Sequence, residues 1–320
     1  MEAPKATAQK APRTGGVRFA PSPTGRFHVG NLRTAWIAQS WAKTLAILFV
    51  VRVEDIDKPR VLPGAREEQL ADMKALGIEP DILLIQSQFH GRHWQLFEEG
   101  VRSGQIYPCD CSRKEVQTAL AGLASAPHDG EPPVYTGQCR PLGKRELAKA
   151  ESVGWRFSMP TESGQDDFII ARTGPSLDAK GLPDRGSFVP AYHWACAIDD
   201  YDGGYDILVR SIDLLPAMKV QFAIQTWIAK LETNAKFKLP AVFHTSLVVQ
   251  DDGSRLEKRT KGVTLPDLEA KGVLPSQILD RFQSSFNPRR LLHEPPSGAS
   301  LREENEQLAL SELWARPGSS

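Results

Sequence analysis

The chain has 320 residues, and its 39 Lys and Arg residues balance its 39 Asp and Glu residues. A net charge of zero excludes a strongly basic coat for nucleic acids, so any contact with RNA must come from local patches. No apolar run reaches the roughly 18 residues of a membrane span, so we expect no membrane partner. Three of the four cysteines are clustered as in a metal site rather than a disulfide framework, which is typical of a reducing compartment, so we expect a cytoplasmic protein.

The first part of the chain alternates strands and helices. Residues 1–16 carry basic side chains among Ala, Pro and Gly, which predicts a disordered basic tail rather than a secretory signal. The elements expected in residues 17–104 are strands at Val17–Ala20 and Leu45–Val53 and helices at Leu32–Leu45 and from about Ala65 to Gly77. This β-α-β-α order is typical of a parallel sheet with right-handed crossovers.

The later parts of the chain differ in character. Residues 105–160 hold three cysteines and a stretch rich in Gly, Pro and Ser, which indicates an insertion. The αβ pattern resumes in 161–262, and 263–320 predicts a short helical C-terminal region with a frayed end. Expected here are strands at 167–170, 205–209 and 241–249, a helix whose core face carries Ile224, Trp227, Ile228 and Leu231, and a core strand containing Cys196.

The run from Arg18 to Asn31 places His28 and Gly30 where a strand gives way to a helix. The amides and the dipole of a helix start favour an anion such as a phosphate. A glycine lets a ligand approach the backbone, and an imidazole can hydrogen-bond phosphoryl oxygens as charge builds on them. The run therefore predicts a nucleotide site.

The same run resembles the nucleotide-binding motif of the glutamyl branch of class I aminoacyl-tRNA synthetases, and Val51–Asp57 resembles the second block of that branch. Pro59-Arg60, Pro63–Ala65 and Gln86–Gln88 resemble a narrower family, the glutamyl-queuosine tRNA(Asp) synthetases, which are shortened glutamyl-tRNA synthetases. The resemblance runs from about residue 17 to about residue 260. It implies an α/β fold, with a Rossmann-like parallel-sheet catalytic domain in two halves, a zinc-containing insertion and a small helical C-terminal part.

The resemblance also implies two substrate sites. For glutamate it implies Arg18, Ser22, Glu54, Tyr192 and Arg210. Arginine grips carboxylates through paired hydrogen bonds, a glutamate side chain can take the substrate ammonium, and a tyrosine offers a hydroxyl. For ATP, which magnesium would accompany, it implies His28, Gly30, Asn31 and Lys258, of which His28 and Lys258 are catalytic.

The chain departs from the family pattern at two places. In the loop that resembles the family's lysine loop, Arg255 stands where the first lysine is usual and Glu257 where a serine is usual. A glutamate beside the triphosphate would repel it, which keeps open a catalytically silent, tRNA-binding paralogue. Residues 175–186 are longer than the family's loop before Tyr192, so that wall of the glutamate site is expected to be remodelled.

The cysteine cluster resembles the structural zinc site of the family, with Cys109, Cys111 and Cys139 as ligands. Thiolates hold zinc in a tetrahedral cage, and three of them leave one position. The resemblance implies Tyr135 as the fourth ligand, and His128 is the alternative that chemistry alone would favour.

The resemblance implies ATP-dependent activation of L-glutamate and its transfer to queuosine at the wobble position of tRNA(Asp), with the anticodon stem-loop as partner. No seam in the sequence demands a dimer, so we expect a monomer. Only about sixty residues follow Lys258, fewer than the anticodon-reading helical domain of a glutamyl-tRNA synthetase needs. That count disfavours, without removing, the alternative of a truncated glutamyl-tRNA synthetase that charges a tRNA acceptor end.

Overall fold

A computed structural model of the chain divides into two compact units. Unit 1 consists of Met1–Lys10, Phe89–Ile198 and Ala223–Ile228, and unit 2 of Ala11–Gln88, Asp199–Phe222 and Ala229–Ser320. The structure describes residues 8–111, 135, 137, 139–140, 152–159, 166–253, 263–286, 299–303 and 307–311. Among these residues, no helix is both long and apolar enough to cross a membrane.

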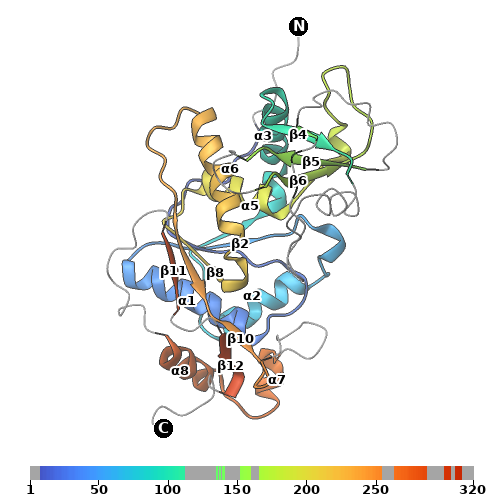
Figure 1. Cartoon of the computed structure of the whole chain (residues 1–320). Helices are drawn as coiled ribbons and strands as arrows, with labels where there is room; N and C mark the ends of the chain where they lie inside the picture. The colour runs from blue at the N-terminus through green and yellow to red at the C-terminus, as the bar shows by residue number, and fades with distance from the viewer. Residues whose placement is uncertain are drawn as a thin grey trace, which may run out of the picture. The chain divides into compact units, whose positions relative to one another are not determined.

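Unit 2 is built on a six-stranded sheet whose strand order is β11-β9-β8-β1-β2-β3 (Figure 1). Its strands are β1 (Val17–Phe19), β2 (Phe49–Val53), β3 (Ile82–Ile85), β8 (Ile207–Ser211), β9 (Ala241–Thr245) and β11 (Ser300–Arg302). Every neighbouring pair is parallel. The chain begins at the central strand β1, adds β2 and β3 toward one edge, and then returns to add β8, β9 and β11 on the other side of β1. This is the doubly wound order, and ligands of such sheets bind where the order reverses, here between β1 and β8. The predicted parallel α/β sheet is confirmed.

The helices of unit 2 agree with the sequence in type and place. They are α1 (Val29–Leu45), α2 (Ala65–Ala75), α7 (Leu265–Glu269) and α8 (Pro275–Ser285), with 3₁₀ turns at η1 (Lys58–Arg60), η2 (Gln86–Phe89) and η6 (Ile212–Leu214). Helices α5 (Tyr192–Gly203) and α6 (Ala217–Leu231) contribute residues to both units. Gly77, which follows α2, has a φ of 64°, the left-handed conformation that ends many helices.

The parallel register sorts the strand residues of unit 2 onto two faces. Phe19 lies beside Val51 and Val209, and these side chains belong to an apolar core that includes residues of α1. Trp41 of α1 and Phe243 of β9 have ring centroids 5.5 Å apart in this core. Because successive residues alternate between faces, the residues before and after this row face the other way.

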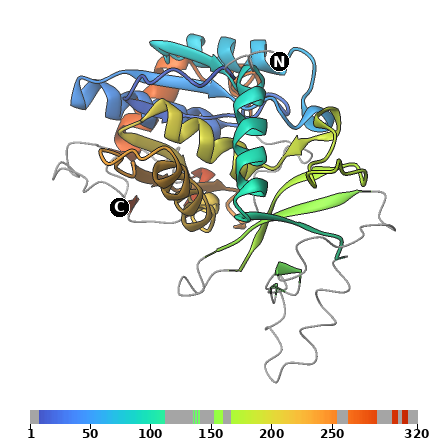
Figure 2. The same ribbon diagram turned by 90° about the horizontal axis from the view of Figure 1, so that it is seen from above.

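Unit 1 contains a four-stranded antiparallel sheet in the order β4-β5-β6-β7, drawn in green shades in Figure 2. Its elements are β4 (Ile106–Cys109), β5 (Val153–Phe157), β6 (Phe168–Thr173), β7 (Val189–Pro190), α3 (His90–Arg102) and η5 (Arg185–Ser187). Aromatic side chains fill its core, and the rings of Phe97 and Trp155 lie 5.0 Å apart. The expected insertion thus shares a sheet with the strand that follows it.

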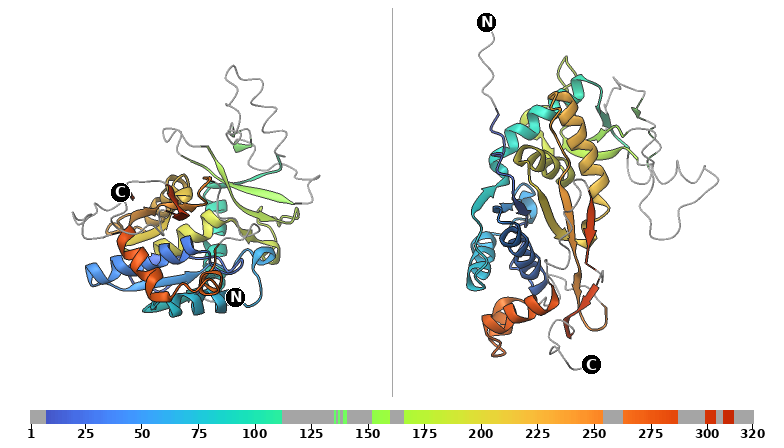
Figure 3. Two further views of the ribbon diagram at one scale, coloured as in Figure 1. Left: turned by 90° about the horizontal axis from the view of Figure 1, so that it is seen from below. Right: turned by 90° about the vertical axis from the view of Figure 1, so that its left-hand side faces the viewer.

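The C-terminal part contains strands as well as the predicted helices. Strand β11 lies beside β9, and β12 (Gln307–Ala309) pairs in parallel with β10 (Leu247–Val249), as the red and orange strands of Figure 3 show. The expected strand at 241–249 is divided into β9 and β10.

The structure differs from two further expectations, which concern Cys196 and the N-terminal stretch. Cys196 is buried, as expected, but it lies in helix α5, so the predicted strand there is wrong. Part of the N-terminal stretch expected to be disordered contacts folded chain, because the amides of Thr14 and Gly15 donate to the carbonyl of Gly203 and Ala11 is buried.

Candidate functional site

His28 caps the N-terminus of α1 with its own side chain. Its backbone is extended (φ −84°, ψ 164°), and its Nδ1 accepts a hydrogen bond from the amide of Gly30 at 3.1 Å. A nitrogen that accepts carries no proton, so in the neutral imidazole the proton is on Nε2, which can then donate. The cap therefore fixes one tautomer and places a donor at the start of a helix.

Gly30 lies in tight contact with neighbouring side chains of the protein. A Cβ at this position would lie 3.1 Å from ring atoms of His28 and 3.2 Å from the Cβ of Val248. Such distances are tighter than most real Cβ contacts, so a side chain here would require His28 or Val248 to shift by a few tenths of an ångström.

Both flanks of the segment predicted to be the lysine loop contact this helix start. Before the loop, Val248 of β10 approaches Gly30. After the loop, the carbonyl of Val263 accepts from the amide of Val29 at 2.8 Å, and Thr264 forms a β-bridge with His28. Residues 254–262, which include Arg255, Glu257 and Lys258, lie outside the described residues.

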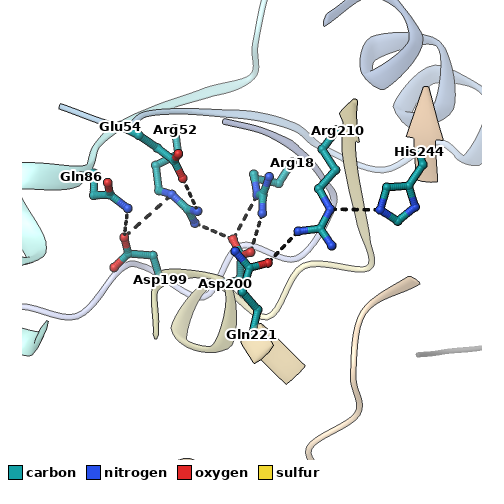
Figure 4. A network of polar contacts seen from close by, with 9 residues as sticks. All are labelled: Arg18, Arg52, Glu54, Gln86, Asp199, Asp200, Arg210, Gln221 and His244. Carbon is teal, nitrogen blue, oxygen red and sulfur yellow. Dashed lines mark hydrogen bonds and ion pairs between the residues drawn. The ribbon is translucent and has the colours of Figure 1, made fainter. Parts of the chain in front are cut away.

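A network of ion pairs lies on the face of the sheet opposite the apolar core (Figure 4). Asp200 accepts from Arg18 Nε at 3.0 Å and also from Arg18 Nη2. The same carboxylate accepts from Arg52 Nη1 at 2.6 Å, and Arg52 Nη2 donates to Glu54 at 3.1 Å. One carboxylate from α5 thus joins the arginines of two neighbouring strands.

A second carboxylate extends this network toward β3. Arg52 Nε lies 3.8 Å from Asp199, and the same carboxylate accepts from Gln86 at 2.7 Å. All of these side chains are buried. Charges are buried in proteins when they are paired, so the arrangement holds its members in fixed positions.

Burial and pairing with arginine shift the pKa values of the carboxylates in opposite directions. Burial alone would raise the pKa of Asp200, but Arg18 and Arg52 outweigh it and the pKa lies below its usual value. For Glu54 burial dominates over the same two arginines, and its pKa lies above its usual value. Asp200 therefore stays ionised over a wider pH range than Glu54.

Arg210 of β8 is held by two neutral acceptors. Its Nη1 donates to Gln221 Oε1 at 2.6 Å, and its Nε donates to His244 Nε2 at 3.3 Å (Figure 4). Arg210 and His244 are direct neighbours in the register of β8 and β9. These two bonds orient the guanidinium without contributing negative charge.

The other expected glutamate-binding residues lie as follows. Ser22 is exposed, and its carbonyl accepts from Gln69 Nε2 at 3.1 Å. The amide of Glu54 donates to the carbonyl of Pro21 at 2.9 Å, which ties the start of the Ser22 loop to the end of β2. Tyr192 begins α5 and belongs to unit 1, where its ring lies 5.4 Å from that of His193.

The network includes residues to which the sequence analysis assigned no role, namely Arg52, Asp199, Asp200, Gln221 and His244. A signal for the first of them exists in the sequence, since Arg52 interrupts an apolar strand between two valines. Arginine is almost never fully buried unless it is paired, so a lone arginine in a buried strand indicates an internal ion pair.

The three clustered cysteines of unit 1 converge. Their sulfur atoms, those of Cys109, Cys111 and Cys139, lie within 4.8 Å of one another, with 3.3 Å between Cys111 and Cys139. Tyr135 Oη is 3.8 Å from the sulfur of Cys109 and accepts from the amide of Cys139 at 2.9 Å. His128 lies outside the described residues.

This donor set fits a tetrahedral zinc ion. Zinc–sulfur bonds of about 2.3 Å put ligand atoms roughly 3.8 Å apart, close to the separations seen. Arg156 donates to the sulfur of Cys109 at 3.2 Å, and burial, which would raise the pKa of that thiol, is outweighed by Arg156, so the pKa is lowered. Burial raises the pKa of Tyr135, so the neutral phenol is favoured until a cation compensates.

Residues 16–290 match the family model for the catalytic domain of class I tRNA synthetases (E and Q). The chain is 37% identical over 308 residues to a glutamyl-Q tRNA(Asp) synthetase from Nocardia farcinica, with 89% of this chain and 94% of the relative covered. It is 32% identical to a glutamyl-Q tRNA(Asp) synthetase from Symbiobacterium thermophilum, covering 82% of this chain and 83% of the relative.

Longer relatives match over part of their length. The chain is 29% identical to a glutamate–tRNA ligase from Bacillus licheniformis, with 82% of this chain but 56% of the relative covered. A crystal structure of a glutamate tRNA ligase from Elizabethkingia meningosepticum, in complex with its amino acid, superimposes with a TM-score of 0.64 at 21% identity, covering 94% of this chain and 68% of that chain. This last likeness is one of fold.

Proposed function

The chain belongs to the class I tRNA synthetases (E and Q), and from this premise we propose that it activates L-glutamate with ATP and transfers the glutamyl group to queuosine at the wobble position of tRNA(Asp). Membership of the family makes it a ligase of the aminoacyl-tRNA synthetase type, with glutamate, ATP and tRNA as its substrates. The observation that carries the proposal for glutamate is the pair of buried arginines, Arg18 and Arg210, on the two strands that flank the reversal of strand order.

The first step joins a carboxylate to the α-phosphorus of ATP. A carboxylate oxygen forms a new bond to phosphorus, the bond to the β-phosphate oxygen breaks, and pyrophosphate leaves with its electron pair. Negative charge builds on the phosphate oxygens, so donors that are already oriented lower the barrier. We assign this role to the Nε2 proton of His28 and to the positive end of the α1 dipole at Gly30 and Asn31, whose amides donate to His28. Lys258 and the magnesium that would accompany ATP would supply positive charge.

The arginine network supports recognition of an amino acid with two carboxylates. We assign Arg210 to one carboxylate of glutamate and Arg18 to the other, because guanidinium groups bind carboxylates through paired hydrogen bonds. Glu54 then accepts the ammonium group, whose charge favours the ionised form of a side chain that burial otherwise pushes toward protonation. Ser22 and Tyr192 supply hydroxyls.

The second step transfers the glutamyl group. A hydroxyl oxygen of the nucleoside attacks the carbonyl carbon of the mixed anhydride, the carbon–oxygen bond to phosphate breaks, and AMP leaves while the hydroxyl proton passes to solvent or a base. The assignment of queuosine as the acceptor rests on the names of the relatives with the higher identities. Single-stranded loops are the RNA elements that proteins read most readily, which suits an anticodon stem-loop. We expect the enzyme to act as a monomer.

We further propose that Cys109, Cys111, Tyr135 and Cys139 hold one structural zinc ion. Four protein ligands leave no open position, so the ion would stabilise the β4 end of unit 1 rather than take part in the reaction. Metal analysis of freshly purified, reduced protein is expected to give about one zinc per chain, and Cys139→Ser is expected to abolish it. Less than a tenth of an equivalent in the unaltered protein would refute the site.

Two assays separate the proposed function from its alternatives. Glutamate-dependent exchange of labelled pyrophosphate into ATP tests activation, and its absence both with and without tRNA would favour a silent tRNA-binding paralogue. Exchange without tRNA would support the queuosine-modifying enzyme, whereas exchange that requires tRNA would favour a truncated glutamyl-tRNA synthetase. Attachment of labelled glutamate to tRNA(Asp) with queuosine, compared with the same tRNA carrying guanosine, tests the acceptor. Equal labelling of both, or labelling of tRNA(Glu) instead, would refute queuosine as the acceptor and favour charging of an acceptor end.

A further inference from the structure

Gln221 carries a buried donor that no described residue satisfies. Its Oε1 accepts from Arg210 Nη1 at 2.6 Å, which fixes the orientation of the amide, because the reverse orientation would set N–H groups against each other. The Nε2 atom is buried and has no hydrogen-bond partner among the residues described. Buried donors of native proteins are almost always paired, so this one points to a ligand.

His244 fixes the other side of the same guanidinium. Arg210 Nε can only donate, so His244 Nε2 must accept and the imidazole proton must be on Nδ1. Nδ1 lies 3.1 Å from the hydroxyl of Ser300, on the neighbouring strand β11. Burial, together with the charge of Arg210, lowers the pKa of His244 to about 4, which keeps the imidazole neutral near pH 7.

We propose that Gln221 and His244 are positioning residues for Arg210, and that Gln221 Nε2 is a second donor to the same substrate carboxylate that Arg210 binds. The inference deepens the proposed function and rests on it, since glutamate is taken as the substrate. It adds two residues to the glutamate site and makes the site specific for a carboxylate. Arg210 and Gln221 Nε2 both donate to the substrate group, so the side-chain amide of glutamine would place its own N–H groups against these donors.

The contrast with Arg18 supports this division of roles. Arg18 forms two hydrogen bonds with the ionised Asp200, and that carboxylate also accepts a hydrogen bond from Arg52. The bonds that orient Arg210 go instead to an amide oxygen and a neutral imidazole. Neither an amide oxygen nor a neutral imidazole brings a full negative charge, so these two bonds orient Arg210 without neutralising it.

The test compares variants in the glutamate-dependent pyrophosphate exchange assay. Gln221→Glu keeps the acceptor for Arg210 and replaces the donor by a negative charge, and Gln221→Met removes the donor without adding charge. Both are expected to raise KM for glutamate by roughly 10- to 100-fold, the factor for a hydrogen bond to a charged group, and to leave KM for ATP within about twofold. Gln283→Glu, at an exposed position of α8, makes the same change in charge and serves as the matched control.

His244 is tested by a pair of variants. His244→Leu removes the acceptor and is expected to raise KM for glutamate about tenfold, whereas His244→Gln retains an acceptor and is expected to stay within about threefold of the unaltered protein. Gln221→Glu is also expected to lower the preference for glutamate over glutamine at least tenfold, a change that a merely structural role would not produce.

The outcomes distinguish the inference from the function on which it rests. If the unaltered protein shows no glutamate-dependent exchange, the proposed function fails. If it does, but both Gln221 variants keep KM for glutamate within twofold, the assignment of Nε2 is overturned and the proposed function stands. If His244→Leu and His244→Gln weaken glutamate and ATP equally, the positioning role of His244 is overturned.

Discussion

Replacing Asp200 with asparagine tests whether one carboxylate holds the two central arginines. Asp200 is paired with both Arg18 and Arg52, and the three side chains are at most 2% exposed. Removing one partner of a buried ion pair costs about 3–5 kcal/mol, because the remaining charge is left buried. Asparagine is of equal size and can still accept through its amide oxygen, so we expect a loss near the lower end, about 3 kcal/mol.

Thermal unfolding followed by calorimetry measures this loss. For a domain of this size each kcal/mol shifts Tm by roughly 2–4 °C, so Asp200→Asn is expected to lower Tm by about 6–12 °C. Asp57→Asn is the matched control, since Asp57 pairs with Arg60 on the surface, with 53% of its side chain exposed. Surface pairs contribute little, so its Tm is expected to change by no more than about 2 °C.

The pH dependence gives a second measure of the same interaction. The pKa of Asp200 is lowered by its arginines, so the stabilisation is fully present above the ordinary value of about 3.9 and is lost as the pH falls through the lower, folded-state value. The difference in Tm between the unaltered protein and Asp200→Asn should therefore shrink in strong acid. A Tm for Asp200→Asn within 2 °C of the unaltered protein at neutral pH would refute the assigned role.

Three further predictions concern other parts of unit 2. Gly30→Ala is expected to raise KM for ATP at least tenfold, with a loss of about 1–3 kcal/mol, because the new Cβ displaces His28 or Val248; unchanged kinetics with ATP would contradict this. Glu303→Gln is expected to lower Tm by several degrees, since Glu303 pairs with buried Arg33 of α1 at 2.7 Å, and an unaltered Tm would show that this pair contributes little. Because burial raises the pKa of Glu54, kcat/KM for glutamate is expected to fall in acid with an apparent pKa above the ordinary value of about 4.3, and a profile flat down to pH 4 would exclude Glu54 as the ammonium acceptor.

Helices and strands whose apolar residues recur with a clear period were predicted correctly from the sequence. Elements in which that period is ambiguous were not. The helix start at His28 and the alternation of strands and helices up to Gly77 are confirmed. The apolar run around Cys196 was assigned to a strand and is a helix, because a short run buried on all sides has no polar face to reveal its period. Strands β11 and β12 have three residues each, too few for any alternation to show.

The candidate site was predicted in part, for reasons that differ between residues. The motif position Arg18 stands out in the sequence, but its partner, Asp200, lies 182 residues further along the chain. Pairing at such a distance is decided by which helix packs on the sheet, which no local pattern encodes. The apolar face of α6 illustrates the same limit, since Ile224 and Ile228 are buried as predicted while Leu231 is 36% exposed.

The two faces of the parallel sheet explain how a buried site can be this highly charged. Phe19, Val51 and Val209 form one row of the apolar face, and the next row along the strands, on the opposite face, holds Arg52, Arg210 and His244. Because alternation is strict, a strand that supplies a valine to the core must supply its next side chain to the other layer. Helix α5 meets that layer with Asp199 and Asp200, and these carboxylates compensate the arginines of β1 and β2. On β8, Gln221 and His244 orient Arg210 through two bonds to neutral groups, next to the reversal of strand order where the ligands of such sheets bind.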